Sequence, residues 1–257
     1  MDIGINNYYW GLDKNIRLPT PAGYIDRKIC AVDTTFGPPC IFGVKSSIGS
    51  IFLIGDSHAS ELSQLVKQVG LSRGFQVAIG THSGYGLVLQ SSSGNTHPSE
   101  DLAYQNAQST FKWIRTHRPD TVVISENYVY WNKAEMLNAI LNIKKIVKRV
   151  VLVNQTPIFT DSAYMKFLSL LDKPYVPKTK VNIKEIDDRS IEYNSYLKYW
   201  AKVNGIQVID PWNAFCGESS CFRYANGHWL FADLNHLTIY GAERLRPEFE
   251  RILWNVQ

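Results

Sequence analysis

The sequence predicts a three-layer α/β/α domain built around a mainly parallel, five-stranded sheet. From residue 50 onward, short apolar runs alternate with segments whose apolar residues recur at helical spacing. Strands that alternate with helices in this way pair in parallel, with helices covering both faces of the sheet. The chain has 257 residues, of which 45% are apolar, so it can bury a large core.

The five predicted strands are short apolar runs bounded by turn residues. The first run, SIFLI, is followed directly by Gly55, and the third comes after Pro119 and Asp120. Runs with few polar residues are typical of strands that are buried on both faces. The predicted strands are residues 50–54, 75–79, 121–125, 149–154 and 207–209.

Each predicted helix carries apolar residues on one face. In the first helix, Leu62, Leu65, Val66 and Val69 fall on the same side. The last is expected to continue through Pro247. The predicted helices are residues 60–69, 101–117, 135–147, 186–203 and 240–254. Residues 157–182 are an aromatic insertion containing Pro and Lys, for which the sequence predicts no definite structure.

The first part of the chain differs from the rest. Residues 1–46 are rich in Tyr, Pro, Gly and Asn and lack sustained periodicity. We therefore expect an irregular N-terminal extension, residues 1–46, packed on a main domain of residues 47–257.

Charge and hydropathy argue against two features of this chain, a nucleic-acid-binding surface and a membrane-spanning helix. The formal net charge is +4, and its densest basic run, residues 144–149, reads as the solvated end of a helix, so we expect no nucleic-acid partner. No stretch approaches the roughly 18 apolar residues that a membrane-spanning helix needs.

The four cysteines form two local pairs, Cys30 with Cys40 and Cys216 with Cys221. Their spacings do not fit the paired knuckles of a zinc site, so we expect no metal, and two short-loop disulfides in an oxidising compartment are favoured. A four-cysteine metal site and reduced thiols are the alternatives. Residues 1–30 show no secretory signal pattern, so the export or membrane part is expected to lie upstream of this chain.

A nucleophile and its base can be identified from their positions. Ser57 follows the first strand and precedes a helix, so its hydroxyl is held at the carboxyl edge of the sheet, where a helix N-terminus favours negative charge. A hydroxyl needs a His to take its proton and a carboxylate to orient that His. Asp233 and His236 supply both groups, and one turn can join residues three apart.

Gly55-Asp56-Ser57-His58 and the D-x-x-H of residues 233–236 resemble blocks I and V of the SGNH hydrolase superfamily. Ser125-Glu126-Asn127 is similar to block III, although Ser125 replaces the usual Gly. The resemblance implies a flavodoxin-like sheet, a catalytic triad of Ser57, Asp233 and His236, and an oxyanion hole formed by Ser57, Gly84 and Asn127, with Gly86 as the alternative to Gly84.

A narrower resemblance rests on the cysteine order, on GDSHA at residues 55–59 and on LFADLNHLT at residues 230–238. These look like the C-terminal SGNH domain of acyltransferase-3 membrane proteins. By that resemblance, a fused upstream membrane domain delivers acetyl groups, with acetyl-CoA as the ultimate donor and no cofactor bound by this domain. The domain would lie on the periplasmic face of the inner membrane, would act on a polysaccharide acceptor such as lipopolysaccharide O-antigen, and would be monomeric when isolated.

Three functions remain open at this point. The first is an O-acetyltransferase that works through a Ser acyl-enzyme, and the second is an extracytoplasmic carbohydrate esterase or lipase with the same residues. The third is a non-catalytic polysaccharide-binding module, against which the intact Ser, Asp and His set argues.

Neighbouring polar residues have simpler expected roles. Asp56 is expected to stabilise the turn before Ser57, and His58 to be structural or to contact the edge of the substrate. His228 and Trp229 could line a substrate cleft, because they lie close to the triad in sequence.

Overall fold

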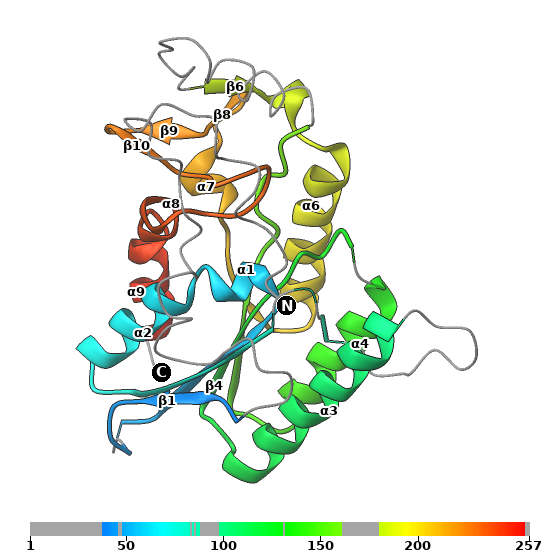
Figure 1. Cartoon of the computed structure of the whole chain (residues 1–257), viewed down its shortest axis with the longest axis vertical. Helices are drawn as coiled ribbons and strands as arrows, with labels where there is room; N and C mark the ends of the chain where they lie inside the picture. The colour runs from blue at the N-terminus through cyan, green and yellow to red at the C-terminus, as the bar shows by residue number, and fades with distance from the viewer. Residues whose placement is uncertain are drawn as a thin grey trace.

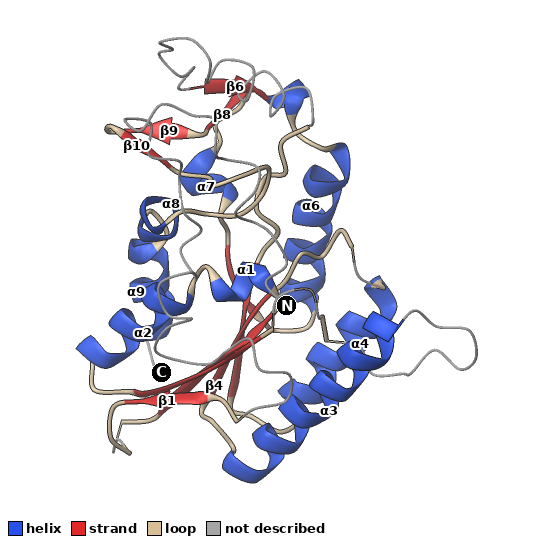
Figure 2. Cartoon of the chain, in the orientation of Figure 1, coloured by secondary structure: helices blue, strands red, loops and turns tan. Residues whose placement is uncertain are grey.

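A computed structural model describes residues 38–45, 48–82, 84, 86–87, 98–130, 132–160 and 180–254, with the backbone alone at 98–101. Its centre is a six-stranded sheet with helices on both faces (Figures 1 and 2). The sheet order is β1-β3-β2-β4-β5-β7. The strands are β1 (Cys40–Phe42), β2 (Ser50–Gly55), β3 (Gln76–Thr81), β4 (Thr121–Ser125), β5 (Arg149–Val153) and β7 (Gln207–Ile209).

The five predicted strands all form, and they pair in parallel. Taken alone, their order is 2-1-3-4-5, which is the flavodoxin-like order, so the predicted fold class is confirmed. The order reverses between β2 and β4, and in such sheets ligands bind beyond the carboxyl ends of the strands at this point.

The sixth strand, β1, was not predicted. It runs antiparallel to β3, with Cys40 opposite Ile79 and Phe42 opposite Val77. The extension of residues 1–46 was expected to be irregular throughout, but three of its residues form β1 and complete one edge of the sheet. Residues 1–37 of that extension lie outside the described residues.

Alternate side chains of the strands enter two cores. In β2, Ile51 and Leu53 face one core, and Phe52 and Ile54 face the other. The first core packs against α2 (Ser63–Ser72) and α9 (Arg246–Trp254). The second packs against α3 (Pro98–His117), α4 (Lys133–Lys144) and α6 (Asp188–Val203). None of the helices that the structure describes is long and apolar enough to cross a membrane.

Two predicted helices differ in the structure. The first, predicted over residues 60–69, is α2 and is preceded by a separate short helix, α1 (Ser57–Ser60), whereas the last is divided into α8 (Ile239–Glu243) and α9. The expectation of one helix running through Pro247 was wrong. Proline has no N–H to donate inside a helix, so Pro247 is accommodated in the first turn of a new helix instead.

Short elements lie beyond the carboxyl edge of the sheet, at the top of Figures 1 and 2. They form two small antiparallel pairs, β6 with β8 and β9 with β10, close to the short helix α7. Strands of two or three residues are too short to show a periodicity, so the sequence did not predict them. Their bounds are β6 (Lys180–Asn182), α7 (Trp212–Phe215), β8 (Ser220–Phe222), β9 (Tyr224–Ala225) and β10 (His228–Trp229), with a 3₁₀ turn at Ile183–Glu185.

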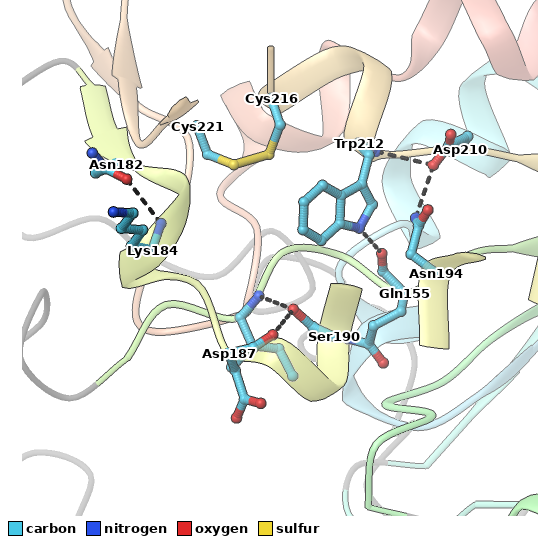
Figure 3. The surroundings of a disulfide bond; sticks show 11 residues. Gln155, Asn182, Lys184, Asp187, Ser190, Asn194, Asp210, Trp212, Cys216 and Cys221 are labelled. Atoms are coloured by element: carbon cyan, nitrogen blue, oxygen red, sulfur yellow. Dashed lines mark hydrogen bonds between the residues drawn. A yellow bond between two sulfur atoms is a disulfide. The ribbon is translucent and has the colours of Figure 1, made fainter. Parts of the chain in front are cut away.

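The predicted Cys216–Cys221 disulfide is confirmed. It closes a tight turn after α7, in which the Gly217 N–H donates to the Ser220 carbonyl at 2.9 Å. Figure 3 shows the bridge near Trp212, whose indole N–H donates to the Gln155 carbonyl at 2.9 Å. Cys40 is also disulfide-bonded, and Cys30, its expected partner, lies outside the described residues.

Candidate active site

The turn after β2 depends on a glycine. Gly55 has a φ of 135°, and a Cβ at this position would overlap the Ser125 carbonyl oxygen of β4. Glycine alone allows this backbone conformation together with so close an approach of two strands. As a result, Ser57 lies at the carboxyl edge of the sheet, where the strand order reverses.

Asp56 holds the loops that follow β2 and β4 together. Its side chain is buried, with Oδ1 accepting the His58 N–H at 2.9 Å and Oδ2 accepting the Asn127 N–H at 2.9 Å. The first bond caps α1, and the second fixes the loop that carries Asn127. The predicted role of Asp56 in stabilising the turn is confirmed.

The structure brings Ser57, His236 and Asp233 into one hydrogen-bonded chain. Ser57 Oγ lies 2.8 Å from His236 Nε2, and His236 Nδ1 lies 2.7 Å from Asp233 Oδ2. The other carboxylate oxygen, Oδ1, accepts the backbone N–H groups of Asn235 and His236 at 2.9 and 2.8 Å. The Asp233 side chain is thus held at both oxygens, and a single turn brings it back to the imidazole.

When the His236 ring is neutral, its hydrogen bonds leave one arrangement of protons. The carboxylate of Asp233 accepts a hydrogen bond from Nδ1–H of His236, so Nε2 of the neutral ring is free to accept the Ser57 hydroxyl proton. Burial lowers the pKa of His236, but the hydrogen bond and charge of Asp233, helped by Glu61 and Asp56, outweigh it and raise that pKa to about 9. Burial raises the pKa of Asp233, but His236 and the two backbone N–H groups outweigh it and lower that pKa below its ordinary value.

Candidate oxyanion groups surround the same loop. The Ser57 N–H makes no hydrogen bond within the described residues. The Asn127 side chain is buried at the same edge, where its Nδ2 amide would be the donor to an oxyanion, whereas its Oδ1 can only accept and has no partner among the described residues. Gly84 is exposed in a turn with a φ of 81°, and Gly86 is buried. Residues 83 and 85 lie outside the described part of the chain, so the choice between Gly84 and Gly86 remains a prediction.

Three buried polar residues near the site had no assigned role in the sequence analysis. Glu61 accepts the Leu237 N–H at 2.7 Å, and Glu126 accepts the Leu87 N–H at 2.8 Å. Thr156 Oγ1 lies 3.3 Å from His58 Nδ1. The sequence carried no signal for Glu61 or Glu126, because the partner of each carboxylate is a backbone N–H group.

The structure bears on the expectations for two further histidines and for a metal site. His58 is buried, which favours its structural role over a contact with the edge of the substrate. His228 is exposed and stacks on Tyr240, with ring centroids 3.6 Å apart, and its place in a substrate cleft remains a prediction. Across the described ranges, no group of three His, Cys, Asp or Glu side chains could hold a metal ion.

Residues 29–251 match the model of a family described as SGNH domain (fused to AT3 domains). No curated protein sequence matches the chain. Among solved structures, the chain is similar to the periplasmic domain of a lipopolysaccharide acetyltransferase from Salmonella ser. Paratyphi A. The identity is 20%, the TM-score is 0.62, and the match covers 80% of this chain and 84% of that one.

Two further solved structures are similar to the chain at lower TM-scores. A catalytic mutant of an acetylxylan esterase from Geobacillus stearothermophilus has 15% identity and a TM-score of 0.48, covering 84% of this chain and 98% of that one. A carbohydrate acetylesterase from Sinorhizobium meliloti has 13% identity and a TM-score of 0.47, covering 80% and 98%.

Proposed function

Because the chain belongs to the family of SGNH domains fused to AT3 domains, we propose that it is a serine acyl-transfer domain that moves an acetyl group to a sugar hydroxyl of a bacterial surface polysaccharide. The observation that carries this proposal is the hydrogen-bonded chain from Ser57 through His236 to Asp233. In this chain Ser57 supplies the nucleophilic hydroxyl, His236 the base, and Asp233 the carboxylate that orients the base.

In the first half-reaction, Ser57 Oγ attacks the carbonyl carbon of the acetyl donor. The hydroxyl proton passes to His236 Nε2, and the resulting imidazolium is stabilised by the Asp233 carboxylate. The tetrahedral intermediate then collapses, the bond to the donor's leaving group breaks, and His236 returns the proton to that group. The product is an acetyl ester on Ser57.

In the second half-reaction, the acceptor sugar replaces the departed group. His236 takes the proton of a sugar hydroxyl while the sugar oxygen attacks the acetyl carbonyl. Collapse of the second intermediate breaks the bond to Ser57 Oγ, which regains its proton from His236. In both intermediates, we assign the oxyanion to the Ser57 N–H, the Asn127 side chain and the N–H of Gly84 or Gly86.

Fusion of this family to AT3 domains supports transfer, with an upstream membrane domain as the source of the acetyl group and acetyl-CoA as its ultimate donor. A periplasmic location would be consistent with the Cys216–Cys221 disulfide and with the location named for the Salmonella relative. The acceptor in this proposal is a polysaccharide such as O-antigen.

Hydrolysis is the second candidate, and the exposure of the site favours it. The side chains of His236 and Asp233 are 26% and 36% exposed, so water can reach the acyl-enzyme as well as a sugar can. The same residues would then make the domain an extracytoplasmic carbohydrate esterase.

The two candidates are separated by what leaves the acyl-enzyme. The chain is incubated with an activated acetyl ester and an oligosaccharide acceptor, and acetylated sugar and free acetate are both measured by mass spectrometry. Transfer predicts acetylated oligosaccharide whose yield rises with acceptor concentration, whereas hydrolysis predicts acetate alone. The surface polysaccharide of cells with and without the parent gene provides the test in the intact organism.

The nucleophile is tested by Ser57→Ala. We expect turnover to fall on the order of 10⁴-fold or more while the protein folds normally, because no other hydroxyl takes the place of Ser57. A fluorophosphonate probe should label wild-type protein at Ser57 and leave the variant unlabelled. Substantial acetyl transfer or ester hydrolysis by the variant would mean that another residue is the nucleophile.

A further inference from the structure

The helix that carries Ser57 also reaches the segment that carries His236. His58 follows Ser57 directly in α1, and Glu61 is the C-cap residue of the same helix. Both side chains are 2% exposed, so they point into the protein rather than toward a substrate. Each of them contacts a neighbour of His236.

His58 takes part in a closed set of contacts around Asn235. The Asn235 Nδ2 group lies 3.3 Å from His58 Nε2, His58 Nδ1 lies 3.3 Å from Thr156 Oγ1, and Thr156 Oγ1 donates to the Asn235 carbonyl at 3.4 Å. An amide nitrogen can only donate, so Nε2 must accept and Nδ1 must carry the ring proton. The proton on Nδ1 then points to Thr156, whose own proton points to Asn235. Every donor in this set has an acceptor when His58 is neutral.

Burial favours the neutral ring. Desolvation lowers the pKa of His58 to about 4, although the nearby charges of Asp56 and Asp233 raise it and that of His236 lowers it. The tautomer that the contacts require is therefore available at neutral pH.

Glu61 holds the other side of His236. Its Oε2 accepts the Leu237 N–H at 2.7 Å, and this contact is buried. Its Oε1 has no hydrogen-bond partner among the described residues and lies 3.8 Å from His58 Nδ1. Burial also raises the pKa of Glu61 well above its ordinary value, and glutamine keeps both the shape of this side chain and the oxygen that accepts the Leu237 N–H.

We propose that His58 and Glu61 are positioning residues, which tie the residues before and after His236 to α1 and so set the separation of the base from the Ser57 hydroxyl. This inference rests on the proposed function, because it assigns a role to these residues only if His236 acts on Ser57. Nucleophile and base are 179 positions apart in sequence, yet α1 holds both. A misplacement of the base by about 1 Å can cost on the order of 100-fold in rate. The contacts of His58 with Asn235 and of Glu61 with Leu237, together called the brace, would therefore affect the rate of catalysis.

The first experiment compares leucine and glutamine at both positions. His58→Leu and Glu61→Leu remove the polar contacts, whereas His58→Gln and Glu61→Gln keep an acceptor for Asn235 and for Leu237. We expect the leucine variants to lose about 10- to 100-fold in kcat for an activated acetyl ester, with KM little changed, and the glutamine variants to stay within a few-fold of wild type. Leucine variants with wild-type kcat would overturn the proposal.

The second experiment asks whether the effect passes through His236. In a His236→Ala background there is no base to position, so adding His58→Leu should not slow the residual labelling of Ser57 by a fluorophosphonate any further. In the background with His236 intact, the same change should slow labelling about 10- to 100-fold. An equal loss in both backgrounds would mean that His58 supports the fold or Ser57 alone, and would overturn the proposal.

Two further variants separate positioning from folding. Asn194→Leu removes a buried amide that donates to Asp210 at 3.0 Å away from the brace, and it should lower the melting temperature without changing kcat measured well below that temperature. Asn235→Ala removes the donor to His58 without altering α1, and it should reproduce the loss in kcat even if the leucine variants fail to fold. Wild-type kcat in folded Asn235→Ala protein would count against the brace, whereas wild-type protein that no probe labels at Ser57 would refute the proposed function instead.

Discussion

Asp233 and His236 form a pair in which the carboxylate decides what the imidazole can do. In Asp233→Asn, Oδ1 can still accept the backbone N–H groups, but an amide NH₂ faces Nδ1 and forces the ring proton onto Nε2. A protonated Nε2 cannot accept the Ser57 proton. We expect kcat to fall about 10⁴-fold with the fold unchanged, as measured by ester turnover and circular dichroism. A loss of less than ten-fold would show that Asp233 does not set the tautomer.

The same pair determines the pH profile. His236 acts as a base only when neutral, and Asp233 raises its pKa to about 9. The value of kcat/KM should therefore rise with pH through the neutral range, reach half its maximum near pH 9 and level off above it in wild-type protein, since this parameter reports the free enzyme. A profile that is already flat above pH 6 would contradict the raised pKa.

Asn127 contributes two groups at one position. Its N–H is fixed by Asp56 at 2.9 Å, which leaves the side chain as the part available to an oxyanion. If the amide is a donor to that oxyanion, Asn127→Ala should lower kcat about 10²- to 10³-fold and leave KM nearly unchanged. Steady-state kinetics provides the measurement. An effect on KM alone would assign Asn127 to substrate binding.

At the level of residues, the sequence predicted the groups that perform chemistry better than those that support them. Ser57, Asp233 and His236 could be found because acyl transfer needs these residue types, and Asp233 and His236 are only three positions apart. Glu61 and Thr156 could not be assigned, because their partners are the Leu237 N–H and the Asn235 carbonyl. Backbone groups leave no trace in the identity of a residue, so such contacts appear only in the structure.

At the level of elements, the short segments beyond the sheet depend on a covalent link. Cys216 and Cys221 close a loop with four residues between them, immediately before the β9–β10 hairpin. Replacing both by Ser should lower the free energy of unfolding by about 2 kcal/mol, the loop-closure entropy expected for a loop of this length. Denaturant titration measures this, and reductant should destabilise wild-type protein more than the double variant, because the disulfide of Cys40 is reduced in both proteins. Equal stability of the two proteins would show that other contacts suffice to order this turn.

The elements that the sequence predicted correctly are those with a clear period. The five parallel strands are apolar runs, and α2, α3, α4 and α6 have apolar faces, so their existence was predicted although their bounds shifted by several residues in places. The edge strand β1 was missed because it has only three residues and pairs with β3, which is remote in sequence. The division before α9 was missed because a helical period continues across a break that proline alone marks.

At the scale of the whole molecule, His58 links stability to pH. Its folded pKa of about 4 lies below its ordinary value of 6.5, so its contribution to stability is fully present above pH 6.5 and is lost as the pH falls toward 4. Compared with His58→Gln, wild-type protein should lose on the order of 3 kcal/mol more of its unfolding free energy over this range. Glu61 titrates in both proteins, so the comparison isolates His58.

Denaturant titrations at pH 7 and at pH 4 give the two unfolding free energies for each protein. His117→Gln is a matched control for the substitution itself, because His117 is exposed and lies outside the contacts around His58. Parallel pH dependences for wild type and His58→Gln would show that His58 is not held neutral in the folded state.

The direction of β1 has a mechanical consequence. The strand runs from Cys40, opposite Ile79, to Phe42, opposite Val77, so the polypeptide joins the sheet on the side where Ser57 lies. If the chain is tethered to a larger body through the residues before Pro38, a pull away from that side acts along β1 and loads its three residue pairs together. Residue pairs that are loaded together resist separation more than pairs that open one after another. A force applied through such a tether would therefore be borne by all three β1–β3 pairs at once, and the edge strand would stay attached to the sheet.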